Sequence, residues 1–203
     1  TQTPKITREQ SIGCILDAIG PSFVTIATTG MASRELYEFR LEKSFQDNKD
    51  FLTVGGMGHA ASIAYGLAVS RPDQKILCLD GDGAALMHMG SLAAVGTSKL
   101  ENFTHIVLNN GCHDSVGGHP TGATGINFCS VAAACGYAST FRLSELEKIE
   151  STLKSLIEAP GPHFLEILVA PGHRKNLKRP ESTPIENKKM LMEHLIGNKS
   201  KSF

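Results

Sequence analysis

Short apolar segments that alternate with segments of helical periodicity constrain this chain more than any other feature of its sequence. The segments 75–79 and 105–108 are mostly apolar and show no alternation of apolar and polar side chains. Strands of this kind are buried on both faces, which is typical of a parallel sheet covered by helices. We therefore expect an α/β fold, an open parallel sheet with helices on both faces.

Turn residues, β-branched runs and helical spacing set the expected element boundaries. Ser33 is a candidate N-cap, and Ser144 with Glu147 fits a capping box. The expected strands are 23–28, 51–54, 75–79, 105–108 and 163–169, and the expected helices are 6–19, 33–41, 58–70, 84–96, 127–135, 144–158 and 184–196.

The chain has 203 residues, enough for one domain with a substantial core. A basic loop with two prolines follows Pro171. We expect residues 1–172 to form one domain and residues 173–203 to be its C-terminal loop and helical tail. The first residue is not Met, which fits a trimmed or partial product.

Charge and cysteine usage exclude several classes of protein. Lys plus Arg and Asp plus Glu each total 20, so we expect neither nucleic acid nor a membrane surface as a partner. No apolar run is long enough to cross a bilayer, and the polar N-terminus lacks the apolar core of a secretory signal. The five cysteines form no C-x-x-C pair, which argues against a disulfide framework and favours a reducing, cytoplasmic location.

Two expected strands end in polar side chains at turns. Asp82 lies between Gly81 and Gly83 after one strand, and Asn109-Asn110 follows the next. Ligands bind beyond the carboxyl ends of parallel strands, and glycines allow the backbone to approach them closely. Asp82 and Asn110 offer oxygen ligands of the kind that Mg²⁺ prefers, so the pattern predicts a diphosphate bound through magnesium. The alternative is that Asp82 only caps a helix and the asparagines form a turn; the pairing of both motifs favours the ligand.

These motifs belong to longer stretches that resemble one family. The stretches are TTGMASRELYE (28–38), DFLTVGGMGHAASIAYGLA (50–68), CLDGDGAALMHMGSLAAVG (78–96), HIVLNNGCHDSVGGHPT (105–121) and PGHRKNLKRPESTPIENK (171–188). They resemble the C-terminal half of the phosphonopyruvate decarboxylases, which depend on thiamine diphosphate and Mg²⁺. The resemblance covers nearly the whole chain and implies a thiamine-diphosphate-binding fold, specifically its diphosphate-binding domain.

The resemblance implies a role for each matching residue. Asp82 and Asn110 would bind magnesium through their side chains, and Cys112 through its backbone carbonyl. Met57 would support the bent form of thiamine diphosphate; its alternative is a core methionine. The residues implied to bind the cofactor are Thr29, Gly30, Gly55, Met57, His59, Gly81, Asp82, Gly83, Ala84, Asn110, Cys112 and His113.

The loop after the second motif is expected to face the substrate. His113, Asp114 and Ser115 are the candidate catalytic residues, with His113 as hydrogen-bond donor or proton shuttle. Asp114 and Ser115 are otherwise ordinary turn formers. His119 is a weaker candidate, because the family usually has Gln there. His59 is as readily a helix cap or core histidine as a cofactor contact, and the basic loop 174–179 is best interpreted as a solvated surface.

The chain lacks a segment resembling the pyrimidine-binding domain that supplies the family's glutamate. The resemblance therefore implies that a partner subunit or a missing segment completes the active site within a hetero- or homo-oligomer. We expect the chain alone to have negligible decarboxylase activity.

The expected reaction is decarboxylation of phosphonopyruvate to phosphonoacetaldehyde and CO₂ in phosphonate biosynthesis, with a small 2-oxo acid carrying an anionic C3 group as the substrate class. The first alternative is the β subunit of a sulfopyruvate decarboxylase, although those enzymes typically have Tyr-Gly where this chain has His113-Asp114. The second is a non-catalytic subunit that binds the cofactor or only supports an assembly.

Overall fold

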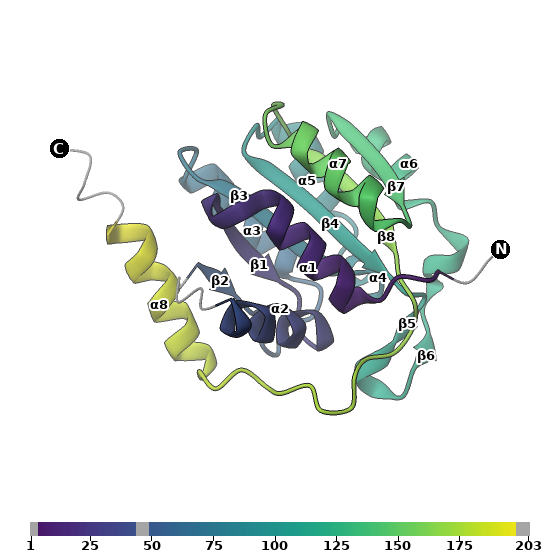
Figure 1. Cartoon of the computed structure of the whole chain (residues 1–203). Coiled ribbons are helices and arrows are strands. Elements are labelled where there is room, and N and C mark those ends of the chain that lie inside the picture. The colour runs from purple at the N-terminus through teal and green to yellow at the C-terminus, as the bar shows by residue number, and fades with distance from the viewer. Residues whose placement is uncertain (1–3, 44–48, 198–203) are drawn as a thin grey trace.

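The computed structural model of the chain describes residues 4–43 and 49–197. Six parallel strands form one sheet in the order β2-β1-β3-β4-β8-β7, which confirms the expected open parallel sheet (Figure 1). The strands are β1 (Phe23–Ala27), β2 (Asp50–Phe51), β3 (Lys75–Gly81), β4 (Phe103–Asn109), β7 (Ser139–Leu143) and β8 (His163–Leu168). The helices are α1 (Arg8–Ile19), α2 (Met31–Glu42), α3 (Ala60–Ser70), α4 (Asp82–Met87), α5 (Ser91–Ser98), α6 (Phe128–Cys135), α7 (Leu146–Leu156) and α8 (Pro184–Gly197).

Helices cover both faces of the sheet, and this explains the continuous apolar strands. Figure 1 shows α1 and α7 in front of the sheet and α3 and α5 behind it. In β3, Ile76 and Cys78 face the core under α3, α5 and α6, whereas Leu77 and Leu79 face the core under α1, α2 and α7; all four are fully buried. Burying each large aliphatic side chain stabilises the fold by about 1.5–3 kcal/mol.

The predicted helix N-termini at Ser33 and Ser144 are wrong. Helix α2 begins at Met31 with Gly30 as its N-cap, and the Ser33 hydroxyl instead donates to the carbonyls of Thr28 and Leu52, at 2.5 and 2.8 Å. Helix α7 begins after Glu145 and has no side-chain cap. A capping box does occur at α1, where Thr7 and Gln10 bond reciprocally.

The single helix predicted over 84–96 is two helices, α4 and α5, separated at His88–Gly90. The break lets α5 pack against α6. There Gly96 lies so close to α6 that an added Cβ would be 2.2 Å from the carbonyl oxygen of Cys135. The apolar composition of residues 84–96 predicts one continuous helix and gives no indication of this contact.

Two further differences concern strands. The sequence prediction missed β7, a partly exposed edge strand with no continuous apolar run. The strand predicted over 51–54 is only Asp50–Phe51, because Thr53 adopts a positive φ of 37°.

The segment after β8 crosses the carboxyl edge of the sheet and leads to α8, which packs beside β2 (Figure 1). Leu191 and Leu195 of α8 join the main hydrophobic core. The boundary at residue 172 remains a prediction, and residues 1–3 and 198–203 of the predicted domain and tail lie outside the described residues. Among the described helices, none has the length and apolar character required to span a membrane.

The strand order reverses direction between β1 and β3, because β2 lies outside β1 while β4 lies on the other side of β3. Such a switch point leaves a crevice at the carboxyl ends of the neighbouring strands. The loops after β1, β3 and β4 meet at this edge, and they carry the motifs that the sequence singles out.

Candidate active site

A cavity lies at the switch point, between the loops that follow β1, β3 and β4. Its wall combines backbone from glycine turns with buried polar side chains. The predicted site residues that line it are Thr29, Gly30, Met57, Gly81, Asp82, Gly83, Ala84, Asn110, Cys112, His113, Asp114 and Ser115. The fold therefore brings together residues from widely separated parts of the sequence, while their individual roles remain predictions.

Gly55 and His59 are predicted site residues that do not line this cavity. The backbone N–H of Gly55 donates to Thr29 Oγ1 at 3.4 Å, which places Gly55 beside a residue of the wall. His59 is exposed at the N-cap of α3, and its ring lies 4.5 Å from the ring of His88. His119 is also outside the wall, in the short hairpin of β5 (Cys112–His113) and β6 (His119–Pro120), paired with His113.

Asp82 is a buried acid, and no cationic side chain of the described residues forms an ion pair with it. It begins α4, is 2% exposed, and accepts a hydrogen bond from Thr121 Oγ1 at 2.5 Å. Burial raises the pKa of its carboxyl above the usual value, although hydrogen bonds from Thr121 and the backbone of Gly83 oppose the shift. The hydrogen bonds that favour the ionised carboxylate come from a hydroxyl and from backbone N–H groups, none of which carries a charge. A buried carboxylate is costly unless it is paired or coordinates a metal, so a bound cation would suit this position.

The donor set at this position is made of oxygen atoms. Asp82 offers a carboxylate and Asn110 a carboxamide, and the thiol of Cys112 is a poor ligand. Burial and the neighbouring Asp114 raise the pKa of Cys112 to about 11, and its Sγ donates to Asp114 Oδ1 at 3.2 Å. A protonated thiol leaves the backbone carbonyl of Cys112 as the available ligand atom. Three oxygen ligands fit a hard cation such as Mg²⁺.

Two glycines keep the wall of the cavity compact. A Cβ on Gly83 would lie 2.3 Å from Cε1 of His113, so only glycine lets the imidazole ring pack against this turn. Gly30 has a backbone φ of 97°, a conformation that residues other than glycine rarely adopt. A close backbone approach of this kind matches the way glycine-rich turns contact a diphosphate.

The sequence analysis missed Arg8, which reaches the cavity from the first turn of α1. Arg8 is 7% exposed and forms ion pairs with Glu35 and Asp114, both at 2.7 Å. Nothing in the sequence distinguishes Arg8 from an ordinary charged residue near a helix start. The only available signal was the capping box at Thr7, which fixes where the helix begins.

A second polar cluster lies deeper, in the core beneath the cavity. Cys78, Asp80 and His105 are fully buried, and their potential ligand atoms lie within 4.8 Å of one another. Asp80 Oδ2 is 3.6 Å from His105 Nε2. These side chains come from β3 and β4 and do not line the cavity.

The comparisons with known proteins assign the class of this domain. The model of the thiamine pyrophosphate enzyme C-terminal TPP-binding domain matches residues 25–167. The chain therefore belongs to the thiamine pyrophosphate enzymes and carries their C-terminal TPP-binding domain.

Two of the relatives within that class are named as decarboxylases. The chain is 36% identical over 182 residues to phosphonopyruvate decarboxylase of Streptomyces viridochromogenes, covering 89% of this chain and 44% of that protein. It is 29% identical over 188 residues to sulfopyruvate decarboxylase subunit beta of Methanococcus maripaludis, covering 93% of this chain and 97% of that subunit. The chain thus spans less than half the length of the first relative. The resemblance inferred from the motifs is confirmed.

A solved structure supports the fold independently. The thiamine diphosphate-dependent 4-hydroxybenzoylformate decarboxylase of Rhodococcus jostii RHA1 superposes with a TM-score of 0.67 at 18% identity, over 84% of this chain and 34% of that one. At this identity the match establishes the shared fold alone.

Proposed function

We propose that this chain supplies the diphosphate-binding half of a thiamine-diphosphate- and Mg²⁺-dependent decarboxylase acting on 3-phosphonopyruvate. The products are phosphonoacetaldehyde and CO₂, and the reaction belongs to phosphonate biosynthesis. The observation that carries the proposal is the meeting of Asp82, Asn110 and Cys112 in one cavity of a TPP-binding domain.

In this proposal the residues of the cavity divide into two groups. Asp82, Asn110 and the Cys112 carbonyl hold Mg²⁺, and the backbone of Gly81, Gly83 and Ala84 approaches the diphosphate, with Thr29 and Gly30 beside it. Met57, in the loop between β2 and α3, supports the cofactor. Thiamine diphosphate supplies an electron sink when CO₂ leaves the substrate, and the protein positions it.

The loop after Cys112 is the proposed substrate side. The His113 ring packs against Gly83, so it is held beside the diphosphate turn, where it donates to the substrate or transfers a proton. Ser115 offers a hydroxyl at the same wall. Asp114 has donors on both carboxylate oxygens, which favours a positioning role over proton transfer.

A partner is required for turnover in this proposal. The chain spans 44% of the phosphonopyruvate decarboxylase it matches, and another relative is named as a subunit. Val54, Met87 and Val116, from segments that adjoin the cavity residues, are 53%, 55% and 64% exposed. Exposed apolar side chains at this edge suit contact with a pyrimidine-binding domain or α subunit. We also propose a cytoplasmic location, which the five free cysteines support.

The second candidate function is the β subunit of a sulfopyruvate decarboxylase. It is favoured by length, because the match covers 97% of such a subunit. The His113-Asp114 pair and the 36% identity favour the phosphonate substrate. A non-catalytic binding or scaffold subunit is disfavoured, because Asp82 and Asn110 are both present at the cavity.

A side-by-side assay decides among the three. The chain is combined with the subunit or segment that supplies the pyrimidine-binding half, and CO₂ release is measured with phosphonopyruvate and with sulfopyruvate. Preference for phosphonopyruvate supports the proposal, and preference for sulfopyruvate selects the second candidate. Turnover of neither acid, in a complex that binds thiamine diphosphate, selects the non-catalytic role.

A further inference from the structure

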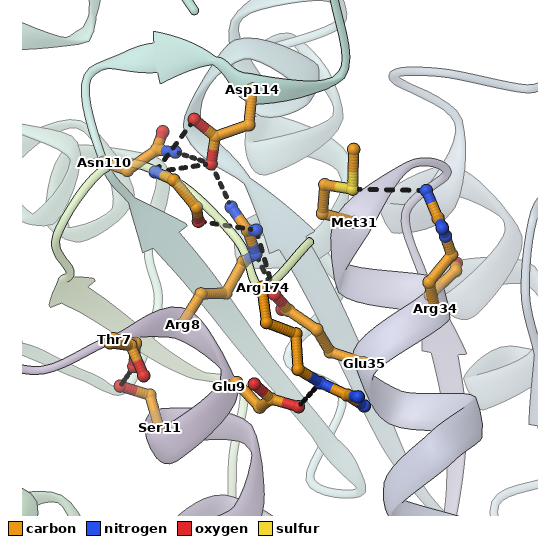
Figure 2. A network of polar contacts seen from close by, with 12 residues as sticks. Thr7, Arg8, Glu9, Ser11, Met31, Arg34, Glu35, Asn110, Asp114 and Arg174 are labelled. Carbon is orange, nitrogen blue, oxygen red and sulfur yellow. Dashed lines mark hydrogen bonds and ion pairs between the residues drawn. The ribbon is translucent and has the colours of Figure 1, made fainter. Parts of the chain in front are cut away.

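The side chain of Arg8 is fixed by two carboxylates from different parts of the chain. Its Nε and Nη2 donate to the two oxygens of Glu35, at 2.7 and 3.0 Å, in the bidentate arrangement that orients a guanidinium firmly. Its Nη1 donates to Asp114 Oδ2 at 2.7 Å, and Nη2 also reaches the carbonyl of Gly172 at 3.2 Å. Figure 2 shows this chain of contacts from Glu35 through Arg8 to Asp114 and Asn110.

The Asp114 carboxylate is held from several directions. Oδ2 accepts from Arg8 and from Asn110 Nδ2, the latter at 2.8 Å. Oδ1 accepts from the backbone N–H of Gly172 at 3.0 Å and from the thiol of Cys112 at 3.2 Å. These donors leave the carboxylate little freedom to rotate.

The held carboxylate determines which way the Asn110 amide is turned. An ionised carboxylate only accepts hydrogen bonds, so the amide nitrogen of Asn110 must face Asp114. Its oxygen then accepts from the backbone N–H of Cys112 at 3.1 Å and keeps a second lone pair. If the amide were turned over, an NH₂ group would replace this oxygen, and an NH₂ group does not bind a cation.

We propose that Arg8 is a positioning residue for the cation site: it holds Asp114, and Asp114 turns the Asn110 amide so that its oxygen is the ligand. This inference rests on the proposed function, because it assumes that Asn110 binds the cation. It adds a residue from α1, far in sequence from both motifs, and it gives Asp114 a supporting task. Metal sites commonly depend on such supporting residues, and their loss weakens metal affinity by about 10–100-fold.

Arg174 provides a matched control. It joins the same two helices as Arg8, with its guanidinium contacting Glu9 of α1 at 2.7 Å and also Glu38 of α2. Its side chain is more exposed, and it does not line the cavity. Replacing Arg174 therefore removes a tie between α1 and α2 while leaving the contact between Arg8 and Asp114 in place.

The test measures Mn²⁺ affinity by electron paramagnetic resonance, with thiamine diphosphate present and with the chain in complex with its pyrimidine-binding partner. Arg8→Lys keeps the charge but cannot contact Glu35 in a bidentate manner while bonding Asp114. We expect Arg8→Lys and Asp114→Asn each to weaken Mn²⁺ binding about 10–100-fold. Arg8→Lys should add little once Asp114→Asn is present, because both act through one contact. Arg174→Lys should leave the affinity unchanged.

A swap of the two side chains separates positioning from general damage to the fold. In the variant carrying Asn110→Asp and Asp114→Asn, the carboxylate at residue 110 presents an oxygen atom in either orientation. The Mn²⁺ affinity of this variant should therefore be higher than that of Asp114→Asn alone. Failure to recover, in a protein that melts cooperatively, would overturn the positioning role even if Arg8→Lys does not fold.

Asp82→Ala distinguishes this inference from the proposed function. If Asp82→Ala abolishes Mn²⁺ binding while folded Arg8→Lys and Asp114→Asn bind as tightly as the native chain, the positioning role is wrong and the proposed site stands. If Asp82→Ala binds Mn²⁺ normally, the proposed site itself is wrong, and the positioning role is rejected with it.

Discussion

Asp80 and Asp82 are two residues apart at the end of β3, both buried, yet they lie in different surroundings. Asp80 is fully buried in the core, where it bonds the backbone N–H of Gly81 at 2.9 Å and faces His105. Asp82 is just past the strand end and lines the cavity. A buried acid is therefore not in itself a functional site, and its position relative to the strand end is the more informative property.

The largest expected effect separates these two acids. Asp82→Ala should weaken Mg²⁺-dependent binding of thiamine diphosphate by more than about 100-fold, since losing a ligand exceeds the effect of losing a supporting residue. Isothermal titration with Mg²⁺ and with EDTA measures it, and EDTA should release the cofactor from the native protein. Native affinity in the Asp82→Ala protein would contradict the assigned site.

Asp80→Ala should show the opposite behaviour. Removing the carboxylate leaves the Gly81 N–H without this acceptor in the core, which costs about 1–3 kcal/mol of unfolding free energy. Urea unfolding measures the loss. The folded Asp80→Ala protein should bind the cofactor normally. Loss of cofactor binding without loss of stability would contradict the proposed difference between Asp80 and Asp82.

Gly83 and Gly96 offer a second comparison, because an added Cβ would meet a neighbouring atom at a similar short distance in both. A Cβ at Gly83 would lie 2.3 Å from the His113 ring, and a Cβ at Gly96 would lie 2.2 Å from the Cys135 carbonyl. Gly96→Ala should lower stability by about 1–3 kcal/mol, because backbone must move. Gly83→Ala should displace the His113 side chain and reduce turnover more than stability. Thermal melts and steady-state assays measure stability and turnover in both variants. Equal losses of stability and of turnover in the two variants would contradict this expectation.

The smallest effect is expected at Cys112. Because the carbonyl is the proposed ligand, Cys112→Ala should leave cofactor affinity nearly unchanged. With a pKa of about 11, the native thiol is mostly protonated at neutral pH, so its alkylation by iodoacetamide should be slow and should accelerate as the pH approaches that value. Rapid labelling of Cys112 at pH 7, located by peptide mass spectrometry, would show that the thiol is ionised. The thiolate would then be a candidate ligand beside the backbone carbonyl.

The sheet was predictable because the continuous apolar runs in β3 and β4 are required by burial on both faces. Asp82 and Asn110 were predictable because they directly follow those runs, whereas most of the other predicted cavity residues were implied only by the family resemblance. Arg8 was not predictable, since its function depends on Glu35 and Asp114, which are distant in sequence and brought near only by the fold. The prediction of Ser33 as an N-cap was wrong for a related reason. The partners of its hydroxyl, the carbonyls of Thr28 and Leu52, are determined by tertiary structure.

The edge of the sheet at β2 shows what the final helix contributes. Asn187 of α8 accepts from the N–H of Leu52 and donates to the carbonyl of Asp50, both at 2.9 Å. One side-chain amide thus makes the two bonds that the peptide of a neighbouring strand would make. Open sheet edges invite pairing with the strands of other molecules. Helix α8 therefore also protects the chain against edge-to-edge aggregation, because Asn187 occupies hydrogen-bonding groups that a further strand would otherwise pair with.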